Sequence, residues 1–137
     1  MKIALCISGQ MRTFKECFPS INKNIIKIFK PDIFISTWKN SGYSKKNDKY
    51  RKKEFLIKKE TLYKVYKTKN IDIELFSNLY YKSINGVHLP DELSKIENGI
   101  AKYTLPMFYK IYRCNEMKKK YEKLNNFKYD FVIRIRP

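Results

Sequence analysis

Short strand-like segments that alternate with segments of helical periodicity constrain the fold of this chain more than any other feature. The strand-like segments are residues 2–7, 32–36, 71–76 and 129–135. The first is a continuous apolar run after one lysine, which is typical of a strand buried in a parallel sheet. Repeated strand–helix alternation predicts an α/β fold with helices covering such a sheet. Right-handed crossovers then place the strands in the order 3-2-1-4, as in a Rossmann-like three-layer sandwich of about four strands.

Three helices are predicted between these strands, over residues 19–30, 54–67 and about 105–123. Pro19 and Pro106 are each assigned to a first turn, where the missing N–H costs nothing. Pro31 ends the first helix at Lys30, because proline disfavours helix in the residue before it. Asn125 and Asn126 are expected to end the third helix. The buried face of the third helix is predicted to be Met107, Ile111, Cys114 and Met117.

The length of 137 residues favours one domain, residues 1–137. Hydrophobic residues make up 43% and aromatic residues 15%, so the chain can bury a core although 31% of it is charged. The Lys-rich stretch 39–53 is predicted to be a flexible, solvent-facing basic loop, and residues 77–98 are predicted to be irregular. No apolar run approaches a membrane span, and no secretory signal is recognised.

The net charge of +17 comes mostly from lysine, since only five of the 30 basic residues are arginine. A lysine-rich composition beside many Asn, Ile and Tyr is what an AT-rich genome produces. It also fits a protein that binds anionic membranes or other polyanions. Nucleic-acid binding is disfavoured, because specific readers of phosphates and bases rely more on arginine. Cys6, Cys17 and Cys114 are widely spaced and His88 is the single histidine, which disfavours a zinc site or disulfide framework and fits a reducing cytoplasm.

Polar residues that follow the first strand form the first candidate site. Ser8, Gly9, Gln10 and Arg12 stand at its carboxyl end, where ligands bind in open α/β sheets. Gly9 would allow close backbone approach, Ser8 and Gln10 could hydrogen-bond a base or ribose, and Arg12 could neutralise a phosphate. The segment is neither a G-x-G-x-x-G nor a P-loop motif, and a plain tight turn remains the alternative.

Two further segments reach the same predicted edge. Arg134 and Arg136 share one face of the last strand, and burying two guanidinium groups there would need an anion such as a diphosphate or internal acids such as Asp32. Thr37 and Trp38 end the second strand, where the indole could stack on a base or cap the core. The core role is the favoured one for Trp38.

The succession of Met1–Arg12, Pro31–Trp38, Met107–Tyr112 with Tyr121-Glu122, and Tyr129–Pro137 resembles glycosyltransferases of bacterial capsule and lipopolysaccharide gene clusters. The resemblance implies a GT-A-like fold that binds a nucleotide-diphosphosugar donor through Ser8, Gly9, Gln10, Arg12, Thr37, Trp38, Arg134 and Arg136. In that family an acidic D-x-D-type metal motif follows the Arg-x-Arg-Pro run. The sequence ends at Pro137, so the family pattern here is truncated and the catalytic and acceptor half is missing from it.

The resemblance also implies partners and a cofactor. The donor would be a nucleotide sugar, the acceptor a saccharide or lipid-linked saccharide, and the divalent cation Mg²⁺ or Mn²⁺ in the intact enzyme, with no ligand for it identified in this sequence. The expected location is the cytoplasm, with possible peripheral association at the inner membrane face. The alternative from another class is a non-catalytic basic α/β module that binds an anionic membrane, a partner protein or nucleic acid.

Overall fold

The computed structural model describes residues 1–41, 55–75 and 101–137, with side chains described from residue 106 onward in the last range. Its sheet contains β1 (Ile3–Gly9), β2 (Asp32–Trp38), β3 (Ile71–Glu74) and β4 (Phe131–Ile135). All three strand pairings are parallel and the order is β3-β2-β1-β4. The predicted strand order 3-2-1-4 is therefore confirmed, and the fold is an α/β, Rossmann-like one.

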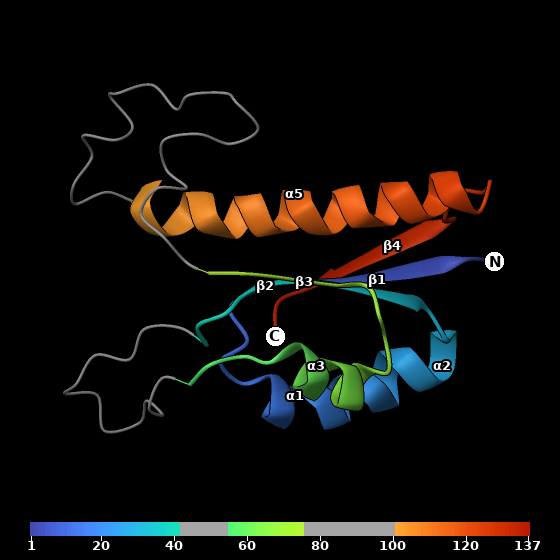
Figure 1. Ribbon diagram of the computed structural model, residues 1–137. Coiled ribbons are helices and arrows are strands. Elements are labelled where there is room, and N and C mark those ends of the chain that lie inside the picture. The colour runs from blue at the N-terminus through green and yellow to red at the C-terminus, as the bar shows by residue number, and fades with distance from the viewer. Residues whose placement is uncertain (42–54, 76–100) are drawn as a thin grey trace.

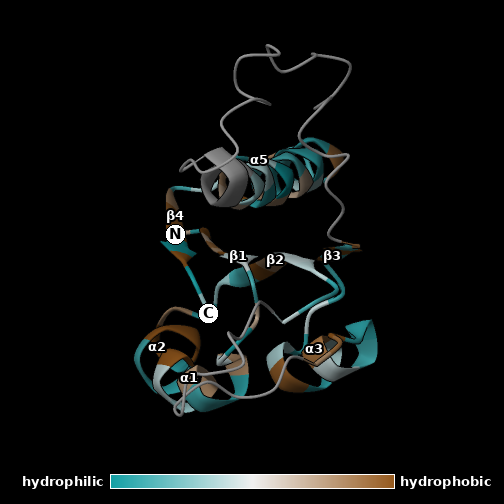
Figure 2. Cartoon of the chain, turned by 90° about the vertical axis from the view of Figure 1, so that its left-hand side faces the viewer, coloured by the Kyte–Doolittle hydropathy of each residue, from teal (hydrophilic) through white to brown (hydrophobic). Residues whose placement is uncertain are grey.

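Helices cover both faces of the sheet (Figure 1). The long helix α5 (Ala101–Leu124) lies on one face, and α1 (Phe14–Ile21), α2 (Lys27–Phe29) and α3 (Lys59–Tyr66) lie on the other. Figure 2 looks along the strands and shows the same three layers, with β4 and β3 at the two edges of the sheet. Because all four strands are parallel, their carboxyl ends lie along the same side of the sheet. The polar residues that follow the strands gather on this side, which we call the carboxyl edge.

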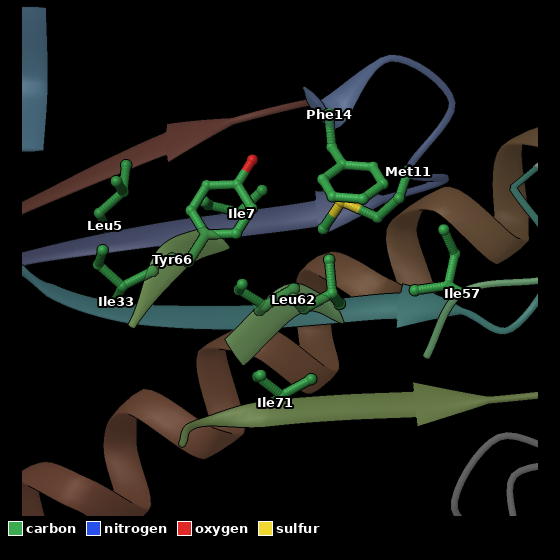
Figure 3. Packing of buried hydrophobic residues seen from close by; sticks show 10 residues of the cluster. Leu5, Ile7, Met11, Phe14, Ile33, Ile57, Leu62, Tyr66 and Ile71 are labelled. Carbon is green, nitrogen blue, oxygen red and sulfur yellow. The ribbon is translucent and has the colours of Figure 1, made fainter. Parts of the chain in front are cut away.

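Apolar side chains fill the space on each side of the sheet. Between the sheet and α1 and α3, the buried side chains come mainly from β1, β2 and β3 and from both helices (Figure 3). This cluster consists of Leu5, Ile7, Met11, Phe14, Ile33, Ile35, Ile57, Leu62, Tyr66 and Ile71. The smaller cluster under α5 consists of Ala4, Cys6, Phe34, Cys114 and Tyr129. Alternate residues of β1 and β2 thus enter opposite cores, as a strand buried on both faces requires.

The first helix begins earlier than predicted. The Cys17 N–H donates to the Thr13 carbonyl at 2.9 Å, and Phe14, the first residue of α1, is 1% exposed. Burial of Phe14 in the core therefore begins the helix five residues before Pro19, which lies inside α1 rather than in its first turn. A π-helical turn at Asn22–Ile26 follows and continues into α2. The predicted end at Lys30 is confirmed, since its φ of 45° leaves the helical region.

The second helix is shorter than the predicted span 54–67, because the residues before Lys59 pair with another segment instead. Leu56 forms an antiparallel bridge with Asn40, and the Ile57 N–H donates to the Lys39 carbonyl at 2.7 Å. This pairing also makes the start of the predicted basic loop ordered, and Ser41 is only 3% exposed. The rest of that loop and the predicted irregular segment 77–98 lie outside the described residues, as does His88.

Helix α5 begins at Ala101, four residues before the predicted start, so that Pro106 lies within it. Cys114 is buried as predicted, but Met107, Ile111 and Met117 are only partly buried. Two lysines, Lys110 and Lys118, occupy fully or nearly fully buried positions instead. Lys110 faces the sheet because Asp72 and Glu74 of β3 form ion pairs with its ammonium group. Lys118 is paired within α5 itself, with Glu122 four residues later. The helix ends before Asn125 and Asn126, as predicted.

Candidate functional site at the carboxyl edge of the sheet

The two segments that carry most of the candidate residues lie next to each other. Ile7 of β1 pairs with Ile135 of β4, and on the other side of β1 Gly9 pairs with Thr37 of β2. The residues that follow Ile7 and Ile135 therefore leave the sheet side by side at the carboxyl edge. The predicted adjacency of Ser8–Arg12 and Arg134–Pro137 is confirmed.

Gly9 ends β1 in a conformation that favours glycine. Its φ is +114°, a region that residues with a Cβ rarely adopt. A Cβ added at Gly9 would lie 3.8 Å from Cγ and 3.9 Å from Nε of Arg136, which is ordinary van der Waals contact. The Arg136 side chain therefore lies directly beside Gly9, which is buried. The end of β1 and an exposed arginine of the segment that follows β4 are thus in contact.

Arg134 and Arg136 both project toward α5, as the strand alternation predicts. Arg134 donates to Oδ1 of Asn115 at 3.3 Å, and Nη1 of Arg136 lies 3.9 Å from the sulfur of Met107. Both residues are exposed, so water solvates their charges and the burial cost considered from the sequence does not arise. Across the described ranges neither arginine forms an ion pair.

Asp32, the internal acid considered as a partner for Arg134 and Arg136, bonds to Tyr129 instead. Its Oδ2 accepts a hydrogen bond of 2.7 Å from the Tyr129 hydroxyl. Burial and this carboxylate together raise the pKa of Tyr129, because both disfavour a phenolate. Asp32 begins β2 and so lies at the opposite edge of the sheet from Arg136. The two arginines therefore keep their charge available at the carboxyl edge.

Gln10 and Arg12 continue the chain after Gly9. The Arg12 guanidinium donates from Nε to Oε1 of Gln10 at 3.0 Å, which holds the two side chains together. Arg12 is exposed, while Ser8 and Gln10 are half-buried. All three side chains reach the surface around Gly9. The structure brings Gly9 and Arg136 together, whereas the Arg12 guanidinium bonds to Gln10.

Thr37 and Trp38 are buried parts of the core. Thr37 is fully buried and its hydroxyl donates to the Trp38 carbonyl at 3.3 Å. The indole of Trp38 is 2% exposed and stacks on Tyr109 of α5, with ring centroids 5.8 Å apart. The ammonium of Lys110 lies 4.4 Å from the indole centroid. These contacts favour the core role for Trp38 over stacking on a ligand.

A buried charge cluster beside this edge was missed by sequence reasoning. Lys110 is fully buried and forms ion pairs with Glu74 and with Asp72, the latter at 3.2 Å. Arg113 adds a bond of 3.3 Å to Asp72, and Tyr109 donates to Glu74 at 2.9 Å. The signal that could have revealed the cluster is the alternation of Ile71 and Ile73 with two acids in a strand expected to be covered on both faces.

The electrostatics of this cluster favour the ionised forms of Asp72 and Arg113. Burial alone would raise the pKa of Asp72, but a hydrogen bond from Ser36 and the charges of Lys110 and Arg113 hold it below its usual value. A hydrogen bond to Asp72 likewise raises the pKa of Arg113, although burial opposes it. Two cations thus balance two carboxylates. The cluster fixes α5 against β3 and leaves no net charge at this side of the edge.

The described residues do not fit a divalent cation. Among them no group of three or more His, Cys, Asp or Glu side chains lies close enough to hold a metal ion. Asp72 and Glu74 are the acids nearest the carboxyl ends of the strands, and lysine, arginine and tyrosine donors already occupy them. We therefore derive no step through a metal at this site.

The sequence predicts all three cysteines to be core residues, and the structure places two of them in the core, so the prediction is wrong for Cys17. Cys6 and Cys114 are buried under α5, and Sγ of Cys114 donates to the Phe34 carbonyl at 3.4 Å. A hydrogen bond from Cys114 lowers the pKa of Cys6, whereas that same bond and burial raise the pKa of Cys114. Cys17 is half-buried on α1.

Comparisons with known proteins give no further guide to this site. No family model matches the chain, and neither the curated proteins nor the solved structures contain a significant match. Within the described ranges no helix is both long enough and apolar enough to cross a bilayer.

Proposed function

We propose that the carboxyl edge of the sheet binds the diphosphate of a nucleotide sugar, and that the chain is the donor-binding part of a glycosyltransferase of surface polysaccharide synthesis. The observation that carries the proposal is the contact between Gly9 and Arg136. Gly9 is buried and lacks a Cβ, which leaves room for the Arg136 side chain beside it, and the exposed guanidinium of Arg136 supplies charge-assisted donors at the end of β1.

The charge balance of the edge supports the same conclusion. On the β3 side the acids and bases cancel, because Lys110 and Arg113 are paired with Asp72 and Glu74. On the β4 side Arg134 and Arg136 have no acidic partner in the described part of the chain. The positive potential is therefore concentrated beside Gly9. A doubly charged diphosphate is the ligand group that this asymmetry suits best.

The base of the nucleotide would have to be recognised without Trp38, because Tyr109 and Lys110 cover the indole. Ser8 and Gln10 are the half-buried polar side chains that remain beside Gly9. Each can donate and accept hydrogen bonds, which suits a base edge or a ribose hydroxyl. With few contacts and no metal site among the residues that the structure describes, we expect a dissociation constant of roughly millimolar, or about −4 kcal/mol.

The test is a calorimetric titration of the chain with several nucleotide sugars, their nucleoside diphosphates and the corresponding free nucleosides. Nucleoside diphosphates and nucleotide sugars should bind and nucleosides should not. Arg134→Ala combined with Arg136→Ala should abolish binding, since each charge-assisted bond contributes about 1.5 to 3 kcal/mol.

The matched control is Lys64→Ala combined with Lys120→Ala, which removes the same charge from exposed positions on α3 and α5. Substitution of Lys45 and Lys46 should likewise leave binding unchanged. The proposal fails if every nucleotide sugar fails to bind while heparin binds tightly. It also fails if the lysine control weakens binding as much as the arginine pair does, because the site would then be a diffuse basic surface.

A further inference from the structure

A second surface lies at the opposite end of the molecule, where the strands begin, and it is both apolar and basic. The parallel topology places the starts of β1 and β4 there, together with the ends of α2 and α5 (Figure 1). We call this surface the amino-edge face. Its exposed large apolar side chains include Met1, Phe29, Leu124 and Phe131, with exposed fractions of 85%, 44%, 74% and 60%. Its exposed lysines include Lys2, Lys30, Lys123 and Lys128.

The acids of this face are already bound within the protein. Asp32 accepts from the Tyr129 hydroxyl, and Asp130 accepts from the Lys2 N–H at 2.6 Å. Glu122, near the end of α5, is paired with Lys118 at 2.7 Å and also accepts from the Tyr129 N–H. The connection between α3 and β3 adds two more exposed lysines, at 67 and 69. Asp32 and Asp130 accept from neutral donors and keep their charge, but the exposed lysines outnumber them. The face therefore combines an excess of positive charge with apolar side chains that lie in water.

We propose that the amino-edge face docks on anionic phospholipid membranes. Apolar side chains surrounded by lysines suit an interface in which hydrocarbon lies just beneath a layer of negative headgroups. Leu124 and Met1 can enter the acyl boundary, while the long stems of Lys123 and Lys128 let their ammonium groups reach the headgroups. The attraction combines apolar burial with charge, and it should weaken as salt screens the lysines.

Other occupants fit these side chains less well. Nucleic acid would be held by arginine forks and by aromatic platforms, whereas the charges named here are all lysines and the two most exposed apolar groups are aliphatic. A second copy of the chain would bring the same positive face against itself. The charge that favours an anionic membrane therefore opposes self-association through this surface.

This docking would set the orientation of the molecule. The seven residues of β1 run from the amino-edge face to Gly9, a distance of about 23 Å at the usual rise per residue. The candidate ligand site would therefore face away from the lipid and remain open. The inference does not depend on what binds at that site, because no residue of the amino-edge face belongs to it.

The test is co-sedimentation with vesicles of phosphatidylcholine alone and of phosphatidylcholine mixed equally with phosphatidylglycerol. The protein should bind only the anionic vesicles, and less at high salt. Lys30→Gln, Lys123→Gln and Lys128→Gln together should weaken binding at least about tenfold. The matched control removes three exposed lysines near the carboxyl edge, by Lys15→Gln, Lys39→Gln and Lys59→Gln, and should change binding less than about twofold.

A second readout reports insertion directly. Leu124→Trp places an indole at the exposed end of α5, and lipids carrying a nitroxide quencher should quench it on binding. Trp38 is buried and serves as an internal control, so it should not be quenched. The proposal would be overturned if the two triple lysine variants lost vesicle binding equally, or if the new indole were not quenched. The proposal would also be overturned if a single-stranded oligonucleotide displaced the protein from the vesicles and if binding of that oligonucleotide required the same three lysines.

Discussion

Lys110 carries a charge that its residue type alone would place in water, yet its side chain is fully buried. Its ammonium is enclosed by Asp72, Glu74 and the face of Trp38. Removing one member of such a cluster leaves the others charged in a poorly solvated place, which costs more than the intact cluster contributes. The stability of this region therefore depends on all members being present and ionised.

Lys110→Met should lower the free energy of unfolding by about 3 to 5 kcal/mol at pH 7. The folded-state pKa of Asp72 lies below its usual value of 3.8, so its contribution is present above that pH and is lost as the pH falls. Without Lys110 that pKa rises, and protonation relieves the unpaired carboxylate. The penalty measured by urea unfolding should therefore be smaller at pH 4 than at pH 7. Lys120→Met, on the exposed side of α5, is the control; equal penalties at both pH values would contradict the assignment.

Tyr66 differs from Lys110, because its buried polar atom is not stabilised by a partner. It is 3% exposed, and within the described residues its hydroxyl has no hydrogen-bond partner. Burial, with a smaller contribution from Cys17, raises its pKa to about 12. Its ring packs edge-on against Phe18, with centroids 5.2 Å apart.

Tyr66→Phe should keep the ring contact and remove the unsatisfied hydroxyl, so the free energy of unfolding should rise by up to about 1 kcal/mol. The gain should grow above about pH 10, where the unfolded tyrosine ionises and the buried one does not. Thermal unfolding of both proteins at pH 7 and pH 10.5 would measure it, with Tyr63→Phe, an exposed tyrosine of α3, as control. A clear loss of stability at pH 7 would show that the hydroxyl has a partner.

At the level of elements, the end of α3 shows where the backbone is under local strain. Lys67 follows the helix with a φ of 55°, and its N–H donates to the Tyr63 carbonyl at 2.8 Å. Residues with a Cβ pay for this left-handed conformation, whereas glycine adopts it freely. The position is exposed, so the side chain contributes little in return.

Lys67→Gly should therefore raise the free energy of unfolding by about 0.5 to 1 kcal/mol. Lys64→Gly, three residues earlier and inside the helix, should lower it by about 1 kcal/mol, because glycine disfavours helical backbone. Chemical denaturation of the two variants beside the wild type measures both effects. Destabilisation by Lys67→Gly of the same size as by Lys64→Gly would show that conformation is not the controlling factor at this position.

The helices also show which sequence signals were sufficient to predict where a helix begins or ends. Lys30-Pro31 and Asn125-Asn126 correctly marked helix ends, because both act on the local backbone. Pro19 and Pro106 were assigned to first turns, but each lies inside a helix whose start is set elsewhere: Phe14 enters the core at the start of α1. Helix starts here depend on tertiary packing, and so does the extended pairing of residues 55–57 with residues 39–41. Neither is encoded in a local pattern.

For the whole molecule, the strand order followed from the alternation of strands and helices and from the handedness of their crossovers. The same topology correctly placed Gly9 beside Arg136. It could not reveal that Trp38 is covered, or that Arg134 and Arg136 are solvated, since both depend on where α5 lies against the sheet. The position of α5 is fixed by the ion pairs of Lys110, which hydrophobic periodicity does not detect.

The placement of β1 in the middle of the sheet has a consequence for synthesis. β1 is made first, and one of its two neighbours, β4, is made last, with Lys2 accepting a hydrogen bond from Asp130. On the ribosome, the edge of β1 that pairs with β4 therefore lacks its backbone hydrogen-bond partners until residue 135 has left the exit tunnel. Such long-range pairing slows folding and leaves the nascent chain exposed to aggregation. We expect this protein to depend on chaperones while it is being translated, and to need them far less once released.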